Sequence, residues 1–220
     1  MFDFIFYFIL FLIYSFIGWI IEMVTVSFTY KRITDRGFLI GPYCPIYGFS
    51  ALIMILTLDK YINDPLVLFL IVAVIASIME YITSYIMEKL FKARWWDYSD
   101  KKFNVNGRIC LENSFLFGLL GLILLYLINP FLSSLLILTN KYFLTTISSF
   151  LLVLFVIDVI ISFNVIRKIK FTAEAITKDY TEEITTRVKE VLYNKSHLTK
   201  RLIEAFPNFS AISVKIKLRK

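Results

Sequence analysis

Residues 4–28 read FIFYFILFLIYSFIGWIIEMVTVSF, and Glu22 is their only charged residue. A helix of about 20 apolar residues crosses a hydrocarbon layer of roughly 30 Å. Three further apolar blocks of sufficient length follow at residues 66–91, 114–138 and 142–166. The chain of 220 residues is 58% hydrophobic, with a mean hydropathy of +0.72, which is outside the range of soluble domains. The sequence therefore predicts an all-α, polytopic membrane protein.

Basic residues gather in alternate loops, and this pattern indicates orientation because cytoplasmic loops carry an excess of Lys and Arg. The loops that follow residues 28 and 91 are basic, as is the tail beyond residue 166, whereas the remaining loops hold one basic residue each. The alternation holds only if a short apolar segment near residues 44–60 also crosses. We therefore predict five transmembrane helices, with the N-terminus outside and the C-terminus inside, at about 4–28, 44–60, 66–91, 114–138 and 142–166.

This topology divides the chain into a membrane domain, residues 1–166, and a cytoplasmic tail, residues 167–220. Apolar residues of the tail recur at helical spacing, with charges between them, up to Pro207, which predicts an amphipathic helix. Its apolar face could pack on the protein's own inner loops or on a second copy, or it could dock another subunit. The net charge of +7 favours membrane lipid rather than nucleic acid as a partner.

The stretch GFLIGPYCPIYG, residues 37–48, concentrates glycine and proline where the chain is about to re-enter the membrane. Non-helical backbone at membrane depth requires protein or a water-filled cavity to satisfy its polar groups. We expect this stretch to dip along the inner mouth of the bundle, with a tight cytoplasmic turn as the alternative. A second short apolar segment, residues 115–128, is expected to be interrupted by Asn129-Pro130. Paired broken segments can indicate a transporter binding site, although apolar sequences also resemble one another by chance.

Three acids lie inside the predicted spans and away from their ends: Glu22, Glu80 and Asp158. Each costs about 2.5–3.5 kcal/mol at a helix centre, so each should face the interior and have a partner. No basic residue lies deep in any span, so we expect the partners of these acids to be inner-loop arginines: Arg36, Arg94 or Arg108. In particular, we predict that Glu22 and Glu80 share one cavity, each within reach of Arg36 or Arg108. The alternative is that Glu–Arg pairs only fasten the loops to the helix ends.

The candidate substrate or ion cavity combines these acids with polar neighbours, the glycine- and proline-rich stretch and the aromatic inner loop. Its residues are Glu22, Arg36, Gly41, Pro42, Tyr43, Cys44, Pro45, Tyr47, Glu80, Ser84, Glu88, Trp96, Asp97, Tyr98, Arg108 and Asp158.

Several chemistries lack the residues that they need. The chain contains no G-x-x-x-x-G-K-[ST], G-x-S-x-G or H-E-x-x-H motif. With His197 as the single histidine, a zinc or haem site lacks ligands. We therefore expect no cofactor, no metal and no catalytic residue. One alternative is a membrane enzyme that acts on lipid, with Glu22 and Glu80 as acid and base. The sequence shows no nucleophile for such an enzyme, which argues against it.

Three motifs are shared with a known family: GWIIE (18–22), DRGFLIGPYCPIYG (35–48) and WWDYSDKKFNVNGRICLENSFLFG (95–118). Over roughly residues 10–125 the chain resembles the CmpB-like family of ABC-transporter type IV permeases, which are small bacterial integral membrane proteins. The resemblance implies a transport permease in the bacterial plasma membrane. Because the sequence has no nucleotide-binding motif, an ATP-driven cycle would need a separate ATPase subunit as a partner. A second copy of the chain, in a homo-oligomer, is the other candidate partner. The alternative function is a non-transporting scaffold or regulatory subunit that recruits a partner through its tail.

Overall fold

The computed structural model describes residues 2–31, 37–91, 93–176, 189–191, 193, 197–206 and 210–211. Most of these residues are helical. The α-helices are α1 (Phe2–Tyr30), α2 (Pro45–Thr57), α3 (Pro65–Phe91), α4 (Leu111–Ile123), α5 (Asn129–Leu138), α6 (Lys141–Ile176) and α8 (His197–Ala205). The shorter elements are η1 (Asp59–Tyr61), η2 (Leu124–Ile128), β1 (Ala93–Arg94), β2 (Asn104–Val105), β3 (Ile109–Cys110) and β4 (Ser210–Ala211).

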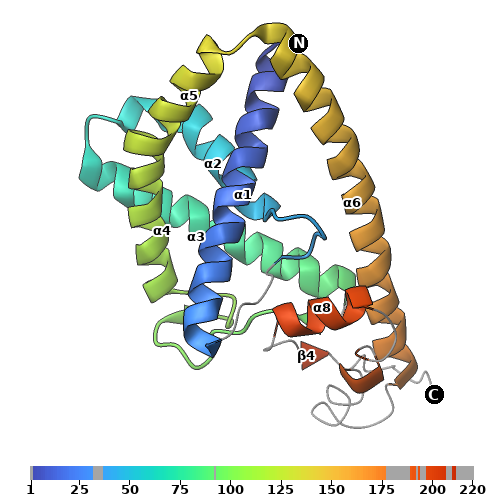
Figure 1. Ribbon diagram of the computed structural model, residues 1–220. Coiled ribbons are helices and arrows are strands. Elements are labelled where there is room, and N and C mark those ends of the chain that lie inside the picture. The colour runs from blue at the N-terminus through green and yellow to red at the C-terminus, as the bar shows by residue number, and fades with distance from the viewer. Residues whose placement is uncertain are drawn as a thin grey trace, which may run out of the picture.

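In Figure 1, α1 runs through the middle of the bundle, with α4 and α5 on one side and α6 on the other. Helix α3 slants behind α1. Helix α8 lies across the lower end, and we refer to this end as the α8 end. Under the predicted orientation the α8 end is cytoplasmic.

Within the described ranges, four helical stretches are long and apolar enough to cross a membrane: Asp3–Phe28, Pro65–Phe91, Leu111–Leu138 and Lys141–Arg167. The predicted all-α membrane fold is confirmed. Helix α2 lies in the short segment, residues 44–60, that the count of five spans requires. It has 13 residues, so it rises only about 20 Å. That rise is shorter than the hydrocarbon layer. The count of five spans and the orientation stay predictions.

The expected interruption at Asn129-Pro130 was wrong, because one helical stretch runs through it from Leu111 to Leu138. The π-helical turn η2 immediately precedes this dipeptide. Proline lacks an N–H, and its ring clashes with the carbonyl of the residue four positions earlier. A wider π turn relieves that clash without ending the helix.

Small residues allow the helices to approach closely. On α2, a Cβ added at Gly48 would lie 2.5 Å from the backbone oxygen of Phe11 on α1. On α4, a Cβ at Gly121 would lie 2.1 Å from a methyl carbon of Val72 on α3. Both separations are shorter than any real Cβ contact, so these glycines set the spacing of the α1–α2 and α3–α4 pairs.

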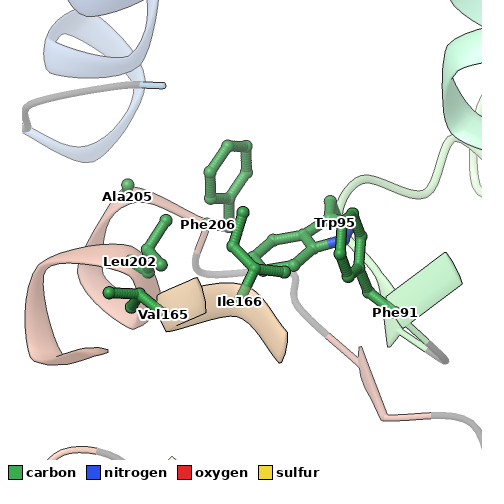
Figure 2. Close-up of a cluster of buried hydrophobic side chains, with 7 residues drawn as sticks. All are labelled: Phe91, Trp95, Val165, Ile166, Leu202, Ala205 and Phe206. Atoms are coloured by element: carbon green, nitrogen blue, oxygen red, sulfur yellow. The ribbon is translucent and has the colours of Figure 1, made fainter. Parts of the chain in front are cut away.

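The described part of the tail, mainly α8, packs on its own chain at the α8 end. Figure 2 shows the cluster, which combines side chains from α3 and the residues after it, from α6 and from α8: Phe91, Trp95, Val165, Ile166, Leu202, Ala205 and Phe206. Strands β1 and β4 also pair, antiparallel, with Ala93 opposite Ala211. Helix α6 continues to Ile176, past the predicted domain boundary. Residues 177–188 of the predicted amphipathic stretch lie outside the described residues.

Candidate functional site

Residues 37–44 form a non-helical segment between α1 and α2, which we call the re-entrant segment. Its backbone is held by the carboxylate of Asp158 on α6. The N–H of Ile40 donates to Oδ1 at 2.9 Å, and the N–H of Gly41 donates to Oδ2 at 2.7 Å. The Tyr43 hydroxyl donates to Oδ2 at 2.5 Å, and the Ser162 hydroxyl donates to Oδ1 at 2.8 Å. Four donors therefore saturate this acid.

The re-entrant segment contacts α6 inside the membrane-length part of that helix. Asp158 lies nine residues before Arg167, where the membrane-length part of α6 ends, which corresponds to about 14 Å along a helix. Two other elements satisfy the segment's backbone: Arg201 of α8 donates to the carbonyl of Leu39 at 2.7 Å, and the N–H of Cys44 donates to the carbonyl of Ser15 on α1 at 2.9 Å.

The expectation that Asp158 takes an inner-loop arginine as its partner was therefore wrong. Two backbone amides and a phenol of the re-entrant segment donate to this carboxylate instead. Together they provide at least as many hydrogen bonds as a bidentate arginine would.

A cavity of about 170 Å³ lies between α1, α2, α3, α4 and η2. Its walls are mostly apolar. The polar residues that line it are Tyr14, Glu22, Tyr47, Ser50, Glu80 and Trp96. Mostly apolar pockets that contain a few converging polar groups are the usual form of small-molecule sites.

Glu22 of α1 and Glu80 of α3 thus line the same cavity. The Tyr47 hydroxyl donates to Oε1 of Glu22 at 2.8 Å, and the Tyr98 hydroxyl donates to Oε1 of Glu80 at 3.1 Å. Glu80 is only 8% exposed. Its Oε2 atom is buried and has no hydrogen-bond partner within the part of the chain that the structure describes. Glu80 therefore presents an unsaturated acceptor beside an apolar cavity.

Tyr98 comes from the inner loop, residues 93–110, which connects α3 to α4. The N–H of Tyr98 donates to the carbonyl of Gly107 at 2.8 Å, and the Trp96 indole donates to the carbonyl of Arg108 at 3.2 Å. Gly107 has a φ of +66°, and a Cβ there would lie 2.3 Å from Oδ1 of Asp97. A glycine is required at this turn, which delivers Trp96 and Tyr98 to the cavity.

Electrostatics stabilise the same loop. Burial alone would raise the pKa of Asp97, but hydrogen bonds from Ser99 and the Arg94 guanidinium hold that pKa below its usual range. Burial, together with the nearby Glu80 carboxylate, raises the pKa of the Tyr98 phenol well above its ordinary value. Tyr98 therefore remains a hydrogen-bond donor to Glu80 across the physiological range.

The predicted pairing of Arg108 with Glu80 was wrong. Arg108 lies 2.8 Å from Glu88 and donates to Ser84 at 3.3 Å, while Arg94 reaches Glu88 at 3.2 Å. Glu80 is eight residues further from the inner loop along α3, or about 12 Å, so an arginine from this loop meets Glu88 first. Arg36, the other expected partner, lies outside the described residues.

The structure thus distributes the predicted residues over three places. Glu22, Tyr47, Glu80 and Trp96 line the cavity, with Tyr98 touching Glu80. The re-entrant segment and the start of α2 contain Gly41, Pro42, Tyr43, Cys44 and Pro45. Of these, Gly41 and Tyr43 donate hydrogen bonds to Asp158. Ser84, Glu88, Asp97 and Arg108 belong to the inner-loop network.

Sequence reasoning missed the apolar wall contributed by α4 and η2, which includes Phe117, Leu120, Gly121 and Leu124. The signal that could have found this wall is the pair Gly118 and Gly121, which brings α4 against α3.

The fold and the site define a polytopic helical membrane protein with a re-entrant segment and an acid-lined cavity among its membrane-length helices. Residues 9–163 match the model of the family described as "Putative ABC-transporter type IV". The chain belongs to this family. Searches of curated proteins and of solved structures gave no match.

Proposed function

We propose that this chain is a transport permease subunit and that the cavity between α1, α2, α3 and α4 is its substrate site. The observation that carries this proposal is the pair of carboxylates, Glu22 and Glu80, on the wall of one mostly apolar cavity. Ionisable groups among membrane helices are costly, and they usually mark substrate or ion pathways.

A purely structural acid is expected to have its acceptors filled, and this chain contains an example for comparison. Asp158 receives four hydrogen bonds and holds the re-entrant segment. Glu80 receives one from Tyr98, and its second oxygen faces no donor in the described structure. A buried acceptor without a partner is destabilising, which supports a role for Glu80 toward a ligand.

The scaffold alternative needs an available docking face on the tail. The apolar residues of α8, including Leu202 and Ala205, are instead packed against α3 and α6. This packing favours the permease. The sequence contains no P-loop motif, so an ATP-driven cycle, which the family name suggests, would use a separate ATPase subunit.

Water access to the cavity tests the proposal. Ser50 lines the cavity, whereas Ser149 of α6 is exposed on the outside of the bundle. In full-length protein in nanodiscs, Ser50→Cys should react with N-ethylmaleimide at least tenfold faster than Ser149→Cys. The reason is that the reactive thiolate forms in water and not in hydrocarbon. Wild-type protein gives the background from Cys44 and Cys110. Equally slow reaction of the two introduced cysteines would contradict a substrate pathway.

A further inference from the structure

We infer that the ligand of this cavity is a small organic cation with an apolar body, bound with its ammonium group at Glu80 and Glu22. This inference rests on the proposed function and specifies the chemical class of the substrate. Three properties of the cavity support it: its charge, its size and the chemistry of its walls.

The carboxyl groups of the cavity have no basic partner among the described lining residues. Glu22 and Glu80 are its ionisable carboxylates, and none of the described residues that line it is basic. The Glu80 side chain is more than nine-tenths buried, and its Oε2 has no hydrogen-bond partner in the described part of the chain. An ionised carboxylate can only accept hydrogen bonds. An ammonium group supplies both the missing donor and a compensating charge, whereas an anion would be repelled by both acids.

The size of the cavity limits the ligand. An engineered cavity of roughly 150 Å³ in another protein binds benzene. The cavity, of about 170 Å³, therefore holds one ring with a short arm.

The walls suit such a ligand. Ile17, Ile21 and Leu120 offer an apolar surface for the ring, and Trp96 and Phe117 add aromatic side chains. Aromatic faces attract cations through the ring quadrupole. A metal ion such as Ca²⁺ or Mg²⁺ fits poorly, because it needs about six or more oxygen ligands. The described residues contain no group of three or more His, Cys, Asp or Glu side chains that could hold a metal ion.

Three probes of matched shape test this inference on the wild-type protein: benzylamine, which is protonated at pH 7, benzyl alcohol, which is neutral, and phenylacetate, which is an anion. Binding is measured by isothermal titration calorimetry on full-length protein in nanodiscs, and heats from empty nanodiscs are subtracted to remove partitioning into lipid. We expect saturable binding of benzylamine at least tenfold tighter than that of the other two probes. Absent binding, or equal binding of all three probes, would overturn the inference.

Charge-removing variants assign the binding to the cavity. Glu80→Gln keeps an oxygen that can accept from Tyr98 but removes the negative charge, so benzylamine affinity should fall at least tenfold. Glu112→Gln is the matched control, because Glu112 is exposed and pairs with Lys101 outside the cavity; its affinity should equal that of the wild type. Unchanged binding by Glu80→Gln would overturn the inference. Rapid labelling of Ser50→Cys without benzylamine binding would overturn the cation class alone and leave the permease function standing.

Discussion

The contact between Asp158 and the re-entrant segment makes a quantitative prediction. Replacing Asp158 by Ala removes the acceptor for the N–H groups of Ile40 and Gly41 and for the Tyr43 hydroxyl. Hydrogen bonds to a charged group contribute about 1.5–3 kcal/mol each. Three such bonds at the lower end of this range sum to about 4–5 kcal/mol. Because water at a partly exposed segment replaces some of them, we use the lower end.

The thiol of Cys44 reports opening of this segment. A Cβ added at Gly37 would lie 3.6 Å from Sγ of Cys44, so the thiol packs against the segment itself. Every 1.4 kcal/mol changes an equilibrium about tenfold, so a loss of about 4–5 kcal/mol corresponds to about a thousandfold increase in opening. We expect Asp158→Ala to raise the rate of Cys44 alkylation by N-ethylmaleimide at least tenfold, measured by mass spectrometry on the detergent-solubilised protein.

Two controls accompany this measurement. Ser162→Ala removes one donor to Asp158 but keeps the three bonds to the segment. Because the bonds that hold the segment remain, Cys44 should react less than threefold faster. Cys110 is buried in the inner loop region and should keep its wild-type rate. If Asp158→Ala leaves Cys44 at the wild-type rate, or accelerates Cys110 as much as Cys44, then Asp158 is not a local clamp.

Two further predictions concern the α8 end. Leu202 is only 2% exposed, so Leu202→Ala should lower the free energy of unfolding by about 2–5 kcal/mol and make the tail more sensitive to trypsin. Val191 is exposed, so Val191→Ala should leave the sensitivity unchanged. Equal cleavage of the two variants would argue against docking of α8. Glu88→Gln leaves Arg108, which is 7% exposed, without its ion-pair partner Glu88. We expect the free energy of unfolding to fall by about 2–3 kcal/mol, a value between those of exposed and buried ion pairs. The loss should appear as a lower midpoint of thermal unfolding, followed by tryptophan fluorescence. Glu112→Gln should shift that midpoint by less than half as much, and equal shifts would refute the difference in burial.

The membrane helices could be predicted from the sequence because apolar length alone determines whether a helix can span. Their irregularities could not. Asn129-Pro130 looks like a break, yet η2 absorbs the proline by widening a single turn, and such a turn depends on packing that local sequence does not encode. The glycines and prolines of residues 37–44 predicted a non-helical segment, and the structure has one there. The partner that holds it, Asp158, is more than a hundred residues away in the sequence.

The roles of the acids also could not be predicted from the sequence, because two of them have similar sequence neighbours and different structural roles. Glu80 and Asp158 each lie inside an apolar helix, and each is followed by a serine one turn later, Ser84 or Ser162. In α6 that serine donates to the acid, and the re-entrant segment supplies three more donors. In α3 the corresponding serine accepts from Arg108, and the acid above it keeps an oxygen without a donor in the described chain. What distinguishes the two acids is the number of donors that distant segments bring to each of them. Tertiary packing determines that number, and in the described chain it leaves Glu80, rather than Asp158, with an acceptor oxygen that no protein donor fills.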